Sequence, residues 1–134
     1  MIAFFDTNVL VYTVTKDPRK ARAREVLALG GVVSVQILNE FANVSRNKLR
    51  HGWKEIEETL QDFVEALDEV LAISFETHRA ALAIARDHGV AFYDALIVAS
   101  ALEAGCDTLF TEDMQHGRMF HGLTIRNPFR QGLP

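Results

Sequence analysis

The chain of 134 residues contains 49% hydrophobic and 24% charged residues, a composition typical of one globular domain with its own apolar core. Its formal net charge of −4 argues against a globally basic nucleic-acid binder, and its one cysteine excludes an internal disulfide and a cysteine-based zinc site. No apolar run approaches the roughly 20 residues that a membrane span needs. Met1 leads directly into an apolar segment without the charged region of a secretion signal, so we expect a cytoplasmic protein.

The N-terminal half predicts two strands, each followed by helical segments. In chain order these are a strand at 2–5, a helix over 18–29, a strand at 32–35, a helix over 36–51 and a helix over 56–67. Asp17 is a suitable N-cap for the first helix, with Pro18 at the first helical position and Gly30 as its stop. The last helix has apolar residues at i, i+4, i+7, i+8 and i+11, which give it one apolar face.

The C-terminal half continues the alternation of strands and helices. Its predicted elements are a strand at 70–74, helices over 77–88 and 92–104, and strands at 107–111 and 123–127, with a loop over 112–122. This order predicts an α/β fold, a three-layer α/β/α sandwich around a mostly parallel sheet of four or five strands. We expect a single domain over residues 1–134.

Acidic residues follow two of the predicted strands. Asp6 ends the run "IAFF", and Asp113 lies just beyond the strand "DTLFT". Ligands of parallel sheets bind beyond the carboxyl ends of the strands, so both acids are expected at one edge. Burying an ionised carboxylate is costly without a partner, which suggests a functional role for Asp6. The alternative is that Asp6 only caps a turn or a helix.

Two further acids lie in apolar helical surroundings. Glu40 lies in "QILNEFANV" and Asp94 in "FYDALIVASAL". A helical glutamate is usually exposed, and an acid in the first turn of a helix is often explained by capping and the helix dipole. If these acids and the strand-end acids converge, their charges raise one another's pKa, and Mg²⁺ or Mn²⁺ would relieve that repulsion.

The segments "FFDTNVLVY", "NEF" and "YDALIVASALEAGCDTLFTEDMQHG" resemble the PIN-domain ribonucleases, specifically VapC-type toxins of toxin–antitoxin pairs. The resemblance implies a PIN-like fold and one or two Mg²⁺ or Mn²⁺ ions. The acidic quartet implied as metal-binding and catalytic is Asp6, Glu40, Asp94 and Asp113, with Asn8 and Thr111 as supporting polar residues. Glu112, beside Asp113, leaves open which acid of this loop binds the ion.

The resemblance also implies an activity and partners. Hydrolysis of RNA would leave 5′-phosphate and 3′-hydroxyl ends, and metal-bound water would supply the nucleophile. A small antitoxin protein that covers the acidic pocket is expected, together with homodimerisation.

Basic residues near the acids are candidate phosphate contacts, although solvated helix faces explain many such residues. The hypothesis names Arg46, Lys48, Arg50 and Arg118. Three alternatives remain: His116 as a general acid, an aspartyl phosphatase with Asp6 as nucleophile, and an RNA- or protein-binding module without nuclease activity. The phosphatase alternative is weakened because Asn8 stands where such enzymes have a second acid.

Overall fold

The computed structural model describes residues 1–130, in which helices and strands alternate as the sequence predicts. The elements are β1 (Ala3–Phe5), α1 (Thr7–Tyr12), α2 (Lys20–Ala28), β2 (Val32–Ser34), α3 (Val35–Asn47), α4 (Trp53–Ala66), β3 (Glu69–Leu71), α5 (Phe75–His88), α6 (Phe92–Glu103), β4 (Thr108–Phe110), β5 (Met119–Phe120) and β6 (Leu123–Arg126). Residues 131–134, the end of the predicted domain, lie outside the described part. None of the described helices combines the length and apolar character needed to cross a membrane.

One mostly parallel sheet organises the molecule, in the strand order β3-β2-β1-β4-β6-β5. All neighbouring strands run parallel except β5, which pairs antiparallel with β6. The sheet within residues 1–130 thus has six strands rather than the predicted four or five. The additional strand, β5, lies in the segment expected to be a loop. A two-residue turn, His121 and Gly122, connects β5 to β6, and both turn residues have positive φ. The strand was missed because His-Gly is a much weaker sequence signal for a hairpin than Asn-Gly or Asp-Gly.

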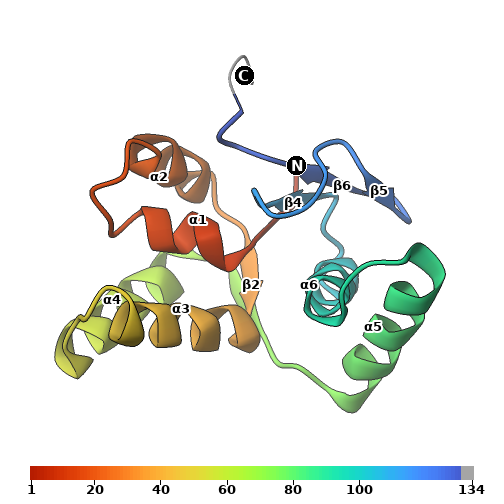
Figure 1. Cartoon of the computed structure of the whole chain (residues 1–134), viewed down its shortest axis with the longest axis horizontal. Helices are drawn as coiled ribbons and strands as arrows, with labels where there is room; N and C mark the ends of the chain where they lie inside the picture. The colour runs from red at the N-terminus through yellow and green to blue at the C-terminus, as the bar shows by residue number, and fades with distance from the viewer. Residues whose placement is uncertain (131–134) are drawn as a thin grey trace.

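Helices cover the sheet on both sides, which confirms the predicted α/β class. Figure 1 shows the pair α5–α6 on one side of β2 and helices α1 to α4 on the other. Helix α6 packs against β2, β4 and β6, and its central residues 95–101 are all buried. The fully buried side chains of the core include Phe4, Phe5 and Phe41. Because β1, β2 and β4 are parallel, the segments after them emerge at one edge of the sheet.

A tight contact joins β1 to the segment that enters β2. Gly31, with φ of 154°, precedes β2, and a Cβ built there would lie 2.6 Å from the carbonyl oxygen of Ala3 and 2.6 Å from the ring of Phe5. Only glycine lets the backbone approach β1 so closely.

Two local predictions for the N-terminal region need correction. No helix is predicted directly after the first strand, but Thr7–Tyr12 form α1, with Asp6 as its N-cap. The predicted N-cap Asp17 instead accepts the backbone N–H of Arg19 at 2.9 Å in a turn, and α2 begins at Lys20. The Asp17 carboxylate also pairs with the Arg19 guanidinium at 2.8 Å, and this local pair stabilises the turn over an earlier helix start.

Candidate metal and catalytic site

Asp6 lies at the centre of a polar cluster beyond the carboxyl ends of β1 and β4. Its side chain is buried, with only 4% of the residue exposed. Oδ1 accepts the backbone N–H of Thr7 at 2.7 Å, so the helix-cap alternative describes part of its role. Oδ2 accepts the hydroxyl of Thr111 at 2.7 Å, which ties the end of β1 to the end of β4. The cap therefore uses only one of two buried carboxylate oxygens.

Asn8 joins the acids that follow these two strands. Its side-chain amide donates to Asp6 Oδ2 at 3.3 Å, to Asp113 Oδ2 at 3.1 Å and to Thr111 Oγ1 at 3.3 Å. The amide nitrogen must face this group because the carboxylates can only accept. The other amide atom, Oδ1, is buried and has no hydrogen-bond partner within residues 1–130. An acceptor left in this way suits a cation or the water bound to one.

Glu40 enters the cluster from α3 through a contact with α1. The Thr7 hydroxyl donates to Glu40 Oε2 at 2.6 Å, and the Gln36 amide lies 3.4 Å from Oε1. Thr7 is not among the site residues predicted from the sequence. The sequence does contain a signal for the helix that begins at Thr7. Asp6 is followed by apolar residues three and four positions later, which is a pattern typical of a helix N-cap.

Asp94 occupies the third position of α6, whose N-cap Ala91 makes no side-chain capping bond. Its place in the first turn suits the helix dipole, as the capping alternative expects. The pKa of Asp94 is raised by burial first and then by the negative charges of Asp113 and Glu40. Asp94 therefore lies within electrostatic reach of Glu40 on α3 and of Asp113 in the loop after β4.

The electrostatics of the cluster disfavour four ionised carboxylates without a cation. Burial raises the pKa of Asp6 to about 6, with further contributions from the charges of Asp113 and Glu40, and the bonds from Thr111 and Thr7 only partly oppose this. Within residues 1–130, none of the four acids has an ion-pair partner. A divalent cation would neutralise this negative charge.

The oxygen atoms of the cluster are of the kind that binds a hard divalent ion, but in the described part of the chain their side chains do not surround an ion site. As they stand in residues 1–130, no three His, Cys, Asp or Glu side chains are arranged to hold an ion together. Oxygen donors alone, from carboxylates and the unpartnered Asn8 Oδ1, are the ligands that Mg²⁺ and Mn²⁺ prefer.

The second acid of the loop, Glu112, is engaged elsewhere. The Tyr12 hydroxyl donates to its Oε1, and Arg19 binds its Oε2 at 3.1 Å. Arg19 also lies 4.3 Å above the Tyr12 ring. With both oxygens of Glu112 bound, Asp113 is the loop acid that remains directed towards Asn8 and Asp6.

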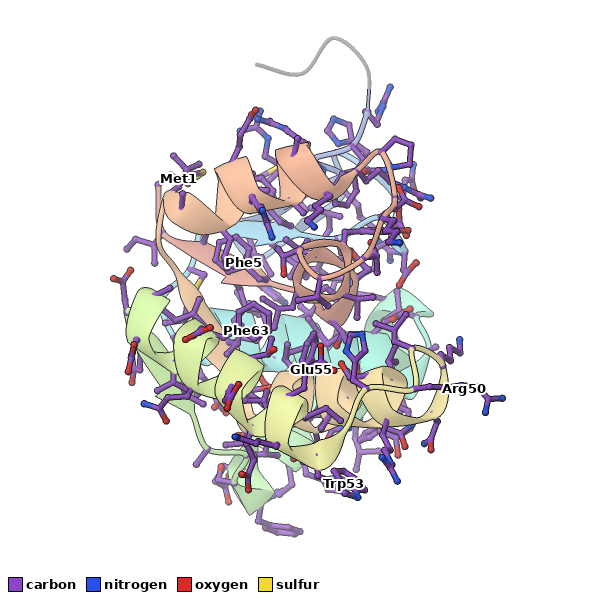
Figure 2. The ribbon with its side chains drawn as sticks, turned by 90° about the vertical axis from the view of Figure 1, so that its left-hand side faces the viewer. Met1, Phe5, Arg50, Trp53, Glu55 and Phe63 are labelled. Carbon is purple, nitrogen blue, oxygen red and sulfur yellow. The ribbon has the colours of Figure 1, made fainter. Side chains whose placement is uncertain are left out.

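Three of the four basic residues predicted to contact RNA are placed away from the acids or bound to other groups. Arg46 lies 4.6 Å above the Trp53 ring, and Arg118 donates to the His88 carbonyl at 2.6 Å. Arg50, with φ of 58°, projects outward at the turn between α3 and α4 (Figure 2). Lys48 differs, because it lines a cleft of about 420 Å³ that also contains Glu40 and Asp113.

His116, the alternative general acid, has a structural contact. Its Nδ1 accepts the backbone N–H of Asn127 at 3.0 Å and so fastens the loop after β4 to the segment after β6. No contact between His116 and the four acids is found in the described residues.

A family model and several solved structures resemble this chain. Residues 3–119 match the family model described as PIN domain. A toxin–antitoxin complex from Klebsiella pneumoniae has a TM-score of 0.71 at 18% identity, over 95% of this chain and 98% of that chain. VapC20 of Mycobacterium tuberculosis, described as a toxin that cleaves the sarcin–ricin loop, has a TM-score of 0.68 at 18% identity over 83% and 91%. VapBC2 of Rickettsia felis, bound to a promoter DNA fragment, has a TM-score of 0.68 at 23% identity over 95% and 98%.

At such identities, the solved structures show a shared fold. No curated protein matches the sequence significantly.

Proposed function

This chain belongs to the PIN domain family, and on that premise we propose that it is a divalent-metal-dependent endoribonuclease acting as the toxin of a toxin–antitoxin pair. The observation that carries the proposal is the cluster in which the Asn8 amide bridges Asp6 and Asp113 while Glu40 and Asp94 lie within electrostatic reach. A structural role alone gives no reason to gather four acids without a cation.

The chain's own residues have distinct proposed roles. Asp6 and Asp94 would be the central ligands of Mg²⁺ or Mn²⁺, Asp113 would complete the set, and Glu40 would bind a second ion or orient the attacking water. Asn8 and Thr111 hold the acids in place through the hydrogen bonds described above. When bound, the ion supplies a more acidic water and offsets the charge that develops on the phosphodiester oxygens.

The proposed partners follow from the solved structures with this fold. Toxin–antitoxin complexes with this architecture support a small antitoxin as protein partner, and VapC20 supports RNA as substrate. The proposed toxin forms a homodimer and acts in the cytoplasm. The aspartyl-phosphatase alternative finds no support, because Asn8 serves as a donor to the acids at the position where such enzymes need a second carboxylate.

The test is cleavage of single-stranded RNA oligonucleotides and total cellular RNA with Mn²⁺, Mg²⁺ or EDTA. Wild type should cleave with either ion, leaving 5′-phosphate and 3′-hydroxyl ends, and should be inactive in EDTA. Asp6→Asn should lose at least about 100-fold in kcat, since a charged ligand becomes neutral. Asp87→Asn is a matched control, because Asp87 is an exposed acid on α5 paired with Arg86.

Equal activity of Asp6→Asn and wild type would reject the proposed site. Metal-dependent RNA binding without cleavage would instead favour the binding-module alternative.

A further inference from the structure

The cleft beside the acids has a charge gradient that the proposed chemistry does not use. It lies between α1 and α3, and its lining includes Val11, Glu40, Asn43, Val44, Lys48 and Asp113. The acids Glu40 and Asp113 belong to the candidate catalytic cluster. Lys48 is the one lysine or arginine in this lining, and it makes no ion pair within residues 1–130.

Helix α3 sets the length of the cleft. Glu40, Val44 and Lys48 follow one another at four-residue intervals and therefore share one face. At 1.5 Å per residue, Glu40 and the helix C-cap Lys48 are separated by about 12 Å along the axis. This leaves room for a base and sugar between a group held by the acids and a group held by the lysine.

The middle of the cleft combines apolar walls with a free hydrogen-bond donor. Val11 from α1 and Val44 from α3 supply apolar surface. The side-chain amide of Asn47 donates to Asn43 Oδ1 at 2.6 Å. This bond orients the Asn43 side chain and leaves its NH₂ group available as a donor. An amide donor beside apolar surface suits the acceptor atoms on the edge of an unpaired base.

We propose that this cleft between α1 and α3 binds one unpaired nucleotide of the RNA next to the scissile phosphate. Lys48 binds the phosphate on the far side of that nucleotide, and Asn43 donates to an acceptor on the base edge. This inference rests on the proposed ribonuclease function and adds to it the path of the strand and a residue that selects the base. The opposite charges at the two ends favour this path. A bound cation attracts one phosphate to the acids, and Lys48 attracts the next.

The test compares Lys48→Gln with Arg86→Gln, which removes one positive charge from the last turn of α5, outside the cleft. Binding of a fluorescent single-stranded RNA oligonucleotide is measured at several salt concentrations with Ca²⁺, and cleavage with Mn²⁺. Lys48→Gln should weaken binding about five- to tenfold, reduce the salt slope by about one, and raise KM with kcat unchanged. Arg86→Gln should match wild type in all three.

Asn43→Ala tests base selection separately. On a library of RNA oligonucleotides, it should relax the preference at one position next to the cut while cleavage of the preferred sequence continues. An unchanged preference would overturn the role of Asn43.

The outcomes separate this inference from the proposed function. If wild type cleaves RNA but Lys48→Gln binds and cleaves like wild type, the strand does not take this path, and the ribonuclease proposal stands. If wild type neither binds nor cleaves RNA with any divalent ion, both proposals fail.

Discussion

Replacing Asp6 by asparagine should stabilise the metal-free protein at neutral pH while it lowers kcat at least about 100-fold. Asp6 is buried, and its pKa is raised from 3.8 to about 6. A folded pKa above the unfolded one means that the native state binds the proton more tightly. The stabilising contribution of that proton is complete below about pH 3.8 and is lost as the pH rises through 6.

The difference between the two pKa values corresponds to at most about 3 kcal/mol of lost stability at pH 7.5. Asparagine carries no charge there and is as good an N-cap as aspartate for the backbone N–H of Thr7. Its NH₂ group meets the two donors to Asp6 Oδ2, the Thr111 hydroxyl and the Asn8 amide, less well than a carboxylate oxygen does, so we expect a net gain of about 1–2 kcal/mol.

Urea unfolding in EDTA between pH 3.5 and 8 measures this effect. The advantage of Asp6→Asn should be largest at pH 7.5 and should vanish towards pH 4. Saturating Mn²⁺ should stabilise wild type by about 2.7 kcal/mol at 100 times Kd and should stabilise the variant much less. A variant that is less stable than wild type at pH 7.5, or a difference that does not change with pH, would refute the reasoning about buried charge.

Three further predictions concern the supporting residues. Asn8→Ala removes the donor between the strand-end acids and should weaken Mn²⁺ binding about 10-fold or more, measured by calorimetry, and unchanged affinity would contradict its bridging role. Thr7→Val deletes the 2.6 Å bond to Glu40 at nearly constant volume and should lower kcat several-fold with KM little changed. Gly31→Ala should cost about 3 kcal/mol or more in thermal unfolding, because its Cβ meets two atoms at 2.6 Å. Gly52→Ala is the control: its Cβ meets nothing within 4 Å, and because Gly52 is the N-cap of α4 the change should alter stability by less than about 1 kcal/mol.

The order of the elements was predictable because it depends on local patterns. Apolar β-branched runs and helical spacing identified β1, β2, β3, β4, β6 and the longer helices. Their alternation implied a parallel sheet, whose geometry puts the residues that follow β1 and β4 at one edge. Asp6 and Asp113 are therefore expected close together from the sequence alone, and the hydrogen bonds of Asn8 to both acids agree with this expectation.

Two short elements, α1 and β5, were not predictable, because contacts distant in sequence stabilise them. Helix α1 has six residues, too few to be stable alone, and it persists because Val9 and Leu10 are buried and Asp6 caps it. Strand β5 has two residues and exists because β6 pairs with it.

The sequence by itself determined which acids follow strands or lie in apolar helical surroundings, because these features depend on neighbouring residues. Only the tertiary structure decided which of these acids have other partners. Glu112 is bound by Arg19, 93 positions earlier in the chain, whereas Asp113 beside it is bridged to Asp6 through Asn8. Adjacent acids are equivalent in a sequence pattern. They differ in the folded protein because a charged side chain at this edge binds whichever donors the packing of α1 and α2 brings within reach.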